Sequence, residues 1–373
     1  MIPLFDLGRM HAPIADRLHD ALARASTAGA FSLGEELASF EEEFAAFCGA
    51  RHCAGVASGT DALALTLRAV GAGPGSEVVT AAHTFFATAE AIVATGATPV
   101  FVDIDPVTRC MDPAALPVAI TARTAAVVPV HLYGRPAPMA EIRRCCDRAG
   151  IPVVEDAAQA HGASLGDRRV GTWGAAAAFS FYPTKNLGAL GDGGAVVSDD
   201  AELIATVRSL RHHGCAPDDA NRHLRFAGTS RLDNLQAAFL RVKLPLLDGW
   251  NRERRAAADR YRDAVDGIEL VLPEPDAAGM EQVHHLFVVE VDDRDRVLGA
   301  LREQRVRAGV HYPIAVPLQP AFGGRFSPDQ FPAAEGLAAR ALSLPLYPGI
   351  TEIEIDVVAS ALNAAVQRFR LAA

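Results

Sequence analysis

Seven short apolar runs alternate with longer amphipathic segments between residues 50 and 200, and this alternation restricts the fold more than any other feature. Each run has about the length of a buried strand, and most are followed by a segment with helical spacing. The pattern predicts an α/β sheet with helices on both faces. Ligands of such sheets bind at the carboxyl ends of the strands, so the polar residues directly after each run are the first candidates for a functional site. The runs are CAGVA (53–57), EVVTA (77–81), TPVFVDID (98–105), AAVVPVH (125–131), IPVVED (151–156), AAFSFY (177–182) and GAVVS (194–198).

The remainder of the chain indicates a second, smaller unit. An apolar run at 284–291 predicts a strand, and the spacing of apolar residues predicts helices at 294–304 and 351–369. A prior of roughly 100 to 200 residues per domain favours two domains for 373 residues. We therefore expect a large domain at 1–250, with an N-terminal helical segment, and a small C-terminal α+β domain at 251–373.

Charge and composition exclude several classes of protein. The 35 basic and 45 acidic residues give a net charge of −10, which disfavours a general surface for nucleic acids or anionic membranes. The start of the chain lacks the pattern of a secretory signal, and no apolar run is long enough for a membrane span. The six cysteines form no paired ligand spacing. We expect a cytoplasmic protein with reduced cysteines and no bound metal.

The first candidate feature is GVASGTDALALTL (55–67), where a strand ends at Ser58-Gly59-Thr60 and a helix begins. Glycine allows the backbone to approach a ligand closely, and the free amides at a helix start suit a phosphate group. The alternative is an ordinary serine cap of the helix. Asp61, in the first turn, fits such a cap and would repel an anion.

The second feature is IPVVEDAAQAHGA (151–163), in which an apolar strand ends at Glu155 and Asp156. A carboxylate at this strand end would keep a basic ring nitrogen protonated, because a nearby negative charge favours the charged form. His161 is placed to orient that carboxylate. The alternative is an aspartate that caps the next helix.

The third feature is Lys185, which follows the strand AAFSFY and precedes a glycine-rich loop. Burial among small and apolar neighbours lowers the pKa of a lysine and exposes the nucleophilic amine, as imine formation with a carbonyl compound requires. Ser180 lies five residues earlier and offers a hydroxyl. The alternative is a lysine that extends its ammonium into water.

The fourth feature is the pair Phe85 and Phe86, directly after the strand EVVTA. An aromatic ring at a strand end can cover the face of a planar cofactor, although two adjacent phenylalanines are more often part of a core. A phosphate cradle, a carboxylate for a ring nitrogen, an aromatic face and an imine-forming lysine are together what pyridoxal phosphate requires.

At these residues the chain resembles the DegT/StrS family of sugar aminotransferases. The resemblance covers almost the whole chain and is carried by SGTDAL, TFFATAEAI, VFVDID, PVHLYGRP, VVEDAAQAHGA, FSFYPTKNLGALGDGGAV, SRLDNLQAA, HYP and LSLPLYP, in family order. It implies the type I aminotransferase fold, with a mostly parallel seven-stranded sheet between helices. It implies Lys185 as the Schiff-base lysine, Asp156 as partner of the pyridine nitrogen and Phe85 as the stacking ring. It also implies Gln159 near the ring hydroxyl and a phosphate site formed by Ser58, Gly59, Thr60 and Ser180.

One position departs from the family pattern. Members usually carry an asparagine two residues before the arginine of SRLD, which they supply to the cofactor phosphate of the neighbouring subunit, and here that position holds Thr229. A hydroxyl still donates one hydrogen bond. The resemblance implies a homodimer with an active site shared across the interface, in which Thr229 takes the place of the asparagine.

The resemblance also implies a reaction. The expected activity is transfer of an amino group from L-glutamate to a nucleotide-linked ketosugar. The segment KNLGALGDGG (185–194) resembles enzymes that aminate C3, so dTDP-3-keto-6-deoxyhexose is the expected substrate. His311 and Tyr312 resemble a segment near the substrate mouth, or are a packing pair between strand and loop. The alternatives are a C4 ketosugar or cyclitol (inosose-type) aminotransferase, a sugar dehydratase, against which Lys185 argues, and a non-catalytic regulatory or binding protein of the same fold.

Overall fold

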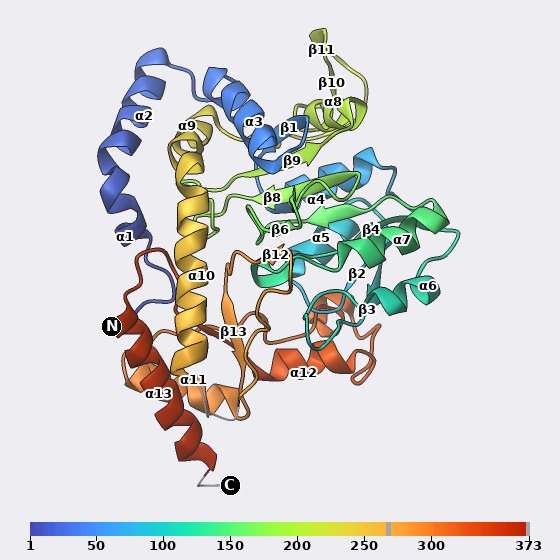
Figure 1. Cartoon of the computed structure of the whole chain (residues 1–373). Helices are drawn as coiled ribbons and strands as arrows, with labels where there is room; N and C mark the ends of the chain where they lie inside the picture. The colour runs from blue at the N-terminus through green and yellow to red at the C-terminus, as the bar shows by residue number, and fades with distance from the viewer. Residues whose placement is uncertain (266–269, 371–373) are drawn as a thin grey trace.

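Seven strands form one mostly parallel sheet at the centre of the molecule (Figure 1). The computed structural model describes residues 1–265 and 270–370. The spatial order is β1–β9–β8–β5–β4–β2–β3, with β4 and β5 joined by parallel bridges such as that from Val130 to Asp156. β9 runs antiparallel to both neighbours, whereas the other adjacent pairs are parallel. The strands are β1 (His52–Val56), β2 (Glu77–Ala81), β3 (Thr98–Val102), β4 (Thr124–Val128), β5 (Val154–Asp156), β8 (Ala176–Ser180) and β9 (Gly194–Ser198).

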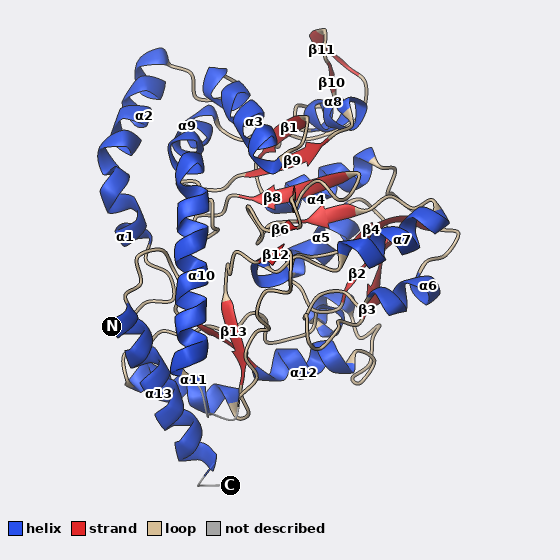
Figure 2. Ribbon diagram, viewed as in Figure 1, coloured by secondary structure: helices blue, strands red, loops and turns tan. Residues whose placement is uncertain are grey.

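This sheet confirms the α/β prediction, because each of the seven apolar runs overlaps one of the strands. Helices cover both faces (Figure 2). Adjacent residues of a strand point to opposite faces, so Val78 shares a buried cluster with α4 and α5 while Val79 shares one with α7. In β9, Val196 likewise packs with α8 and Val197 with α3. One face carries α3 (Glu35–Cys48), α7 (Met139–Ala149) and α9 (Asn234–Lys243); the other carries α4 (Gly59–Ala69), α5 (Phe86–Ala94) and α8 (Ala201–Leu210).

The C-terminal part has a core of its own, built on an antiparallel strand pair, β13 with β14. Helices α10, α11 and α13 pack in the same buried cluster. The strand expected at 284–291 and the helices expected at 294–304 and 351–369 are confirmed with slightly different ends. The elements are α10 (Leu247–Ala264), β13 (Phe287–Glu290), α11 (Arg294–Glu303), α12 (Pro332–Arg340), β14 (Ala341–Leu344) and α13 (Glu352–Arg370).

The N-terminal residues and helix α10 connect the two parts. Residue 250 lies within α10, the long helix that runs down the molecule in Figure 1. At the start of the chain, Ile2 forms a parallel bridge with Val306, and Arg9 pairs with Glu354 at 2.7 Å. The domain boundary at residue 250 stays a prediction. The remaining α-helices and strands are α1 (Leu7–His11), α2 (Ala15–Ala28), α6 (Leu116–Ala119), β6 (Ser164–Leu165), β7 (Arg168–Arg169), β10 (Cys215–Ala216), β11 (Asp219–His223) and β12 (Met280–Glu281).

The described residues contain neither a membrane-spanning helix nor a metal-binding cluster. Within 1–265 and 270–370, no helix combines the length and the apolar character that crossing a membrane demands. The same residues contain no group of three or more histidine, cysteine, aspartate or glutamate side chains arranged to hold a metal ion.

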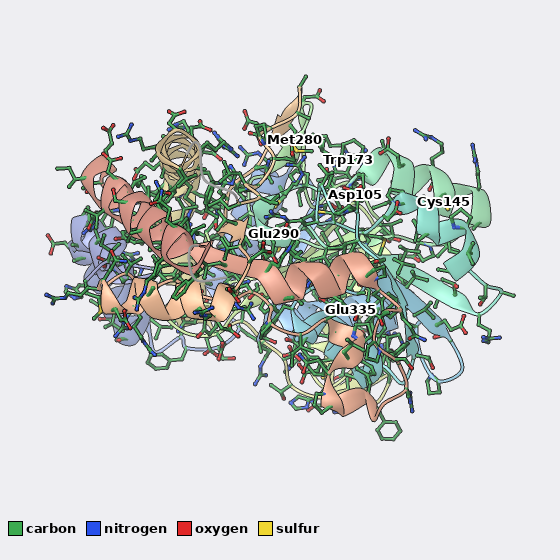
Figure 3. All side chains as sticks on the ribbon, turned by 90° about the horizontal axis from the view of Figure 1, so that it is seen from below. Asp105, Cys145, Trp173, Met280, Glu290 and Glu335 are labelled. Carbon is green, nitrogen blue, oxygen red and sulfur yellow. The ribbon has the colours of Figure 1, made fainter. Side chains whose placement is uncertain are left out.

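A buried ion pair joins the large sheet to the C-terminal part. Arg109, which follows β3, lies 3.0 Å from a carboxylate oxygen of Glu290 on β13, and both side chains are almost fully buried. Arg109 also donates to the carbonyl of Val288, and Arg340 contacts the second carboxylate oxygen of Glu290. Figure 3 labels Glu290 near the middle of the molecule. Each charge of this group therefore depends on its partner, because an uncompensated buried charge is costly.

We expect Glu290→Gln to lower the free energy of unfolding by about 3 kcal/mol, because it leaves Arg109 buried without a counter-charge. Urea denaturation measures this free energy. The matched control is Asp292→Asn, two residues further along and exposed, which should change it by less than about 0.5 kcal/mol. Equal losses in the two variants would contradict the assignment.

Candidate active site

A cavity of about 310 Å³ lies at the carboxyl-terminal edge of the sheet. Its walls come from the segments that follow β1, β2, β4, β5 and β8, and from residues of the C-terminal part. Parallel strands end at the same edge, so residues far apart in sequence meet there. Ten of the residues expected at the site line this cavity: Ser58, Gly59, Thr60, Phe85, Asp156, Gln159, Ser180, Lys185, His311 and Tyr312.

One wall of the cavity has the form of a phosphate cradle. A Cβ atom on Gly59 would lie 2.6 Å from the Cβ of Ser180, and one on Gly194 would lie 2.3 Å from the carbonyl oxygen of Ser58. A side chain at either position would clash with these atoms, so the two glycines allow Ser58, Ser180 and the start of α4 to pack closely at this wall. The backbone N–H groups of Gly59 and Thr60 open helix α4, where the first turn has no intrahelical acceptors. The wall is therefore suited to an anionic group held by backbone amides.

The alternative interpretation of Ser58 as a helix cap also holds. Its hydroxyl accepts a hydrogen bond from the backbone N–H of Asp61 at 3.1 Å. The expected repulsion from Asp61 is reduced, because this carboxylate accepts a hydrogen bond from Ser230 at 2.8 Å. Capping and anion binding are compatible here, because the cap uses the backbone N–H of Asp61 and leaves the N–H groups of Gly59 and Thr60 to bind an anion.

Asp156 ends β5 and is buried at the cavity wall. Thr88 donates to one of its carboxylate oxygens at 2.8 Å, and the N–H of Ala158 donates to the other at 3.2 Å. Burial raises the pKa of Asp156, and these hydrogen bonds and the charge of Lys185 oppose that rise. The helix-cap alternative is wrong, because residues 157–163 form turns and no helix.

The expectation that His161 orients Asp156 is also wrong. Both ring nitrogens of His161 are buried without a hydrogen-bond partner among the described residues, and the ring packs against Phe179 and Phe181. Thr88 takes the orienting position instead. It lies three residues after Phe85 in the first turn of α5, so helical spacing places both on the side of the cavity.

Lys185 lies in the turn after β8, and its side chain lines the cavity. Burial lowers the pKa of its amine from 10.5 to about 8, and the nearby carboxylate of Asp156 acts in the opposite direction. Lys185 is half-buried and its side chain lines the cavity, so it does not match the alternative of a lysine that extends away from the protein into bulk water. The sequence has just one other lysine, Lys243, which is almost fully buried and donates to the carbonyl of Gly188 in the loop after Lys185.

Aromatic and amide side chains complete the opposite side of the cavity. The ring of Phe85 lies 5.3 Å from that of Tyr312 and is half exposed, so Phe85 is not a core residue. Gln159 donates to the hydroxyl of Tyr312 at 3.1 Å and accepts from the backbone N–H of Tyr133 at 2.7 Å. His311 contacts the hydroxyl of Ser343 at 2.8 Å, and burial lowers its pKa to about 4. These side chains are held in place by the protein before any ligand binds.

Thr229 is the one expected site residue that the fold keeps apart from the cavity. It lies near the base of the β10–β11 hairpin, where its hydroxyl is 2.8 Å from Nε2 of His213, and both side chains are exposed. A role for Thr229 at the cofactor thus requires a second copy of the chain.

Comparison with known proteins now identifies the family. Residues 13–363 match the DegT/DnrJ/EryC1/StrS aminotransferase family. The chain belongs to this family. It is 44% identical over 348 residues, 93% of this chain and 91% of the relative, to a Streptomyces venezuelae protein named dTDP-3-amino-3,4,6-trideoxy-alpha-D-glucose transaminase.

Solved structures of DegT-family aminotransferases share the whole architecture. The crystal structure of DesV from S. venezuelae, in complex with a ketimine intermediate, superposes with a TM-score of 0.95 at 43% identity, over 98% of this chain and 99% of DesV. NtdA from Bacillus subtilis, solved with the bound cofactor PMP, gives a TM-score of 0.92 at 33% identity, over 98% of this chain and 85% of NtdA. The type I aminotransferase fold is confirmed.

The cofactor of this family of enzymes is pyridoxal phosphate, and the residues of the cavity fit it. The glycine-lined wall with free amides suits the phosphate, Asp156 suits the ring nitrogen, and the amine of Lys185 suits the carbonyl carbon. Phe85 offers a ring face beside them. We infer these roles from the geometry of the cavity.

Sequence reasoning missed several residues that line the cavity: Phe5, Thr84, Thr88, Tyr182, Asp192 and His285. Thr88 was detectable from its spacing to Phe85. Phe5 lies near the N-terminus and His285 lies in the C-terminal part, and neither carries a local signal, because only the tertiary fold brings them to the site.

The cofactor-free protein should react with added pyridoxal phosphate in a pH-dependent manner. Because the pKa of Lys185 is lowered to about 8, its neutral amine predominates above that pH. The rate of covalent attachment, followed by visible absorbance, should rise up to about pH 8 and then level off. A rate that continued to rise toward pH 10.5 would show that the amine is not desolvated.

Thr88→Val should slow turnover about 3- to 10-fold, because it removes one hydrogen bond from the carboxylate of Asp156. Thr88→Ser keeps the hydroxyl and serves as the matched control. Steady-state rates and the dissociation constant of the cofactor measure the effect. Identical values for the valine and serine variants would refute the role of Thr88.

Proposed function

We propose that this protein is a transaminase that converts a nucleotide-linked 3-ketosugar into the 3-aminosugar, with dTDP-3-keto-6-deoxyhexose as the best candidate substrate. The supporting observation is the cavity that brings Lys185 and Asp156 together, in a chain whose S. venezuelae relative is named for a dTDP-3-aminosugar. The segment 185–194, which follows the lysine, forms part of the same cavity wall through Asp192 and Gly193.

The residues of the cavity suit proton transfer at the reacting carbon. When bound, pyridoxal phosphate supplies an electron sink for the bond broken at that carbon. The Nζ atom of Lys185 is the group that takes and returns the proton, because a pKa of about 8 leaves both protonation states populated near neutral pH. Asp156, fixed by Thr88, holds a positive charge on the ring nitrogen.

The competing activities differ in the residues that they require at this site. A sugar dehydratase of the same fold typically has histidine at the lysine position, and Lys185 argues against that activity. A non-catalytic protein would have no need for a desolvated amine beside a hydrogen-bonded carboxylate. A C4 ketosugar or a cyclitol would use the same catalytic groups, so only a substrate test separates these from the proposed activity.

We further propose that L-glutamate is the amino donor and that the active unit is a homodimer acting in the cytoplasm. Large apolar side chains are exposed on the loop before α3 and around the β10–β11 hairpin, namely Phe31, Leu33, Leu224 and Phe226. Burial of these side chains against a second copy would stabilise the dimer. The same contact would bring Thr229 toward a neighbouring site. Sedimentation at the 39.4 kDa mass of one chain would contradict this proposal.

The decisive test offers the purified protein a 3-keto and a 4-keto nucleotide sugar with glutamate, and locates the new amine by NMR. We expect amination at C3, and loss of visible absorbance when glutamate alone is added. Lys185→Ala is the matched negative control. Amination at C4, or of an inosose in preference to both sugars, would overturn the proposed substrate.

A further inference from the structure

His285 is an active-site residue that the reaction described above does not use. It lies two residues before β13, is 4% exposed and lines the cavity together with Lys185, His311 and Tyr312. Its ring lies nearly parallel to that of Phe5, 6.1 Å away, which fixes the plane of the imidazole. The ring therefore presents a fixed edge to the ligand space.

A chain of hydrogen bonds determines which ring nitrogen of His285 carries the proton. The carbonyl oxygens of His161 and Val283 only accept, so the amide nitrogens of Asn251 and Asn186 must face them, at 2.8 Å and 2.9 Å. The same nitrogen of Asn186 also donates to the side-chain oxygen of Asn251 at 2.9 Å. The side-chain oxygen of Asn186 is thereby left to face Nδ1 of His285 at 3.2 Å, and it can only accept.

Nδ1 of His285 is therefore the protonated nitrogen, and Nε2 carries a lone pair as long as the ring is neutral. Burial and the positive charges of Lys185 and Arg254 hold the pKa of His285 well below its usual value, and His161, His311 and the adjacent His284 also have lowered pKa values. Nε2 has no hydrogen-bond partner in the described part of the chain, and the protein does not fully enclose it. It is an open acceptor at the cavity.

We propose that Nε2 of His285 accepts a hydrogen bond from a hydroxyl group of the ketosugar. A sugar hydroxyl can donate, whereas the carboxylates of an amino-acid donor only accept and would face the lone pair unfavourably. His285 thus favours the sugar over the amino acid in the shared cavity. This inference rests on the proposed ketosugar activity. It also gives Asn186, which is next to Lys185, a role: Asn186 orients the ring of His285 so that Nε2 is the acceptor.

Two substitutions separate the binding role of His285 from its structural role. His285→Gln places an amide oxygen near the position of Nε2 and keeps the acceptor, whereas His285→Asn keeps only a group near the position of Nδ1, which can still bond Asn186. A binding role predicts that the asparagine variant slows the ketosugar half-reaction roughly 10- to 100-fold and the glutamine variant much less. A structural role predicts the reverse order.

The two half-reactions are followed separately by absorbance, with glutamate and with the 3-ketosugar, in the cofactor-loaded enzyme. The glutamate half-reaction of both variants should stay within about threefold of the native rate, since the acceptor does not bind carboxylates. His284→Asn, the same change at the adjacent buried residue outside the cavity, is the control, and thermal unfolding verifies folding.

An asparagine variant that matches the native rate with the ketosugar, or that is impaired only with glutamate, would overturn the inference. Nitrogen-15 NMR of histidine-labelled protein without cofactor tests the tautomer independently of activity and of any substitution. It should show Nδ1 of His285 protonated and Nε2 unprotonated, and the opposite tautomer would refute the inference. Failure of the native enzyme to react with the 3-ketosugar would instead reject the proposed function and leave the tautomer result standing.

Discussion

The site depends on one amine and one carboxylate that share a cavity. Asp156 ends β5, and Lys185 follows the end of β8, which is the parallel neighbour of β5. The order of the strands therefore places the two groups at the same cavity. Burial lowers the pKa of Lys185 and raises that of Asp156, and their mutual attraction acts against both shifts. The pair combines a reactive amine with a carboxylate that can stabilise a positive charge, which is the combination that pyridoxal phosphate chemistry uses.

Hydrogen bonds hold the residues that follow Lys185 in place. Its neighbour Asn186 is held by three hydrogen-bond partners, and the carbonyl of Gly188 accepts from the buried Lys243 on α9. Gln236, also on α9, accepts from the backbone N–H of Leu190. Helix α9 therefore supports the loop after the lysine at two points. A catalytic group on a supported loop keeps its direction, which matters because small misplacements reduce rates strongly.

The sequence predicts the sheet well because buried parallel strands are continuous apolar runs, and the polar residues that end these runs are conspicuous. Asp156, Lys185, Ser58 and Phe85 could be found in this way. Thr88 was missed because its hydroxyl donates to Asp156, which lies 68 positions further along the chain. The ring of His161, the expected partner of Asp156, packs against aromatic side chains instead. His285 was missed because its contact with Asn186, which determines which ring nitrogen carries the proton, exists only in the folded chain.

Chemical trapping of the cofactor tests the central claim most directly. Borohydride reduction of the cofactor-loaded protein fixes the covalent link, and mass spectrometry of a digest locates it. Since the sequence contains only two lysines, the result is unambiguous. Our account predicts the cofactor mass on the peptide that contains Lys185. The cofactor mass on the peptide with Lys243, or no covalent attachment to either lysine, would contradict it.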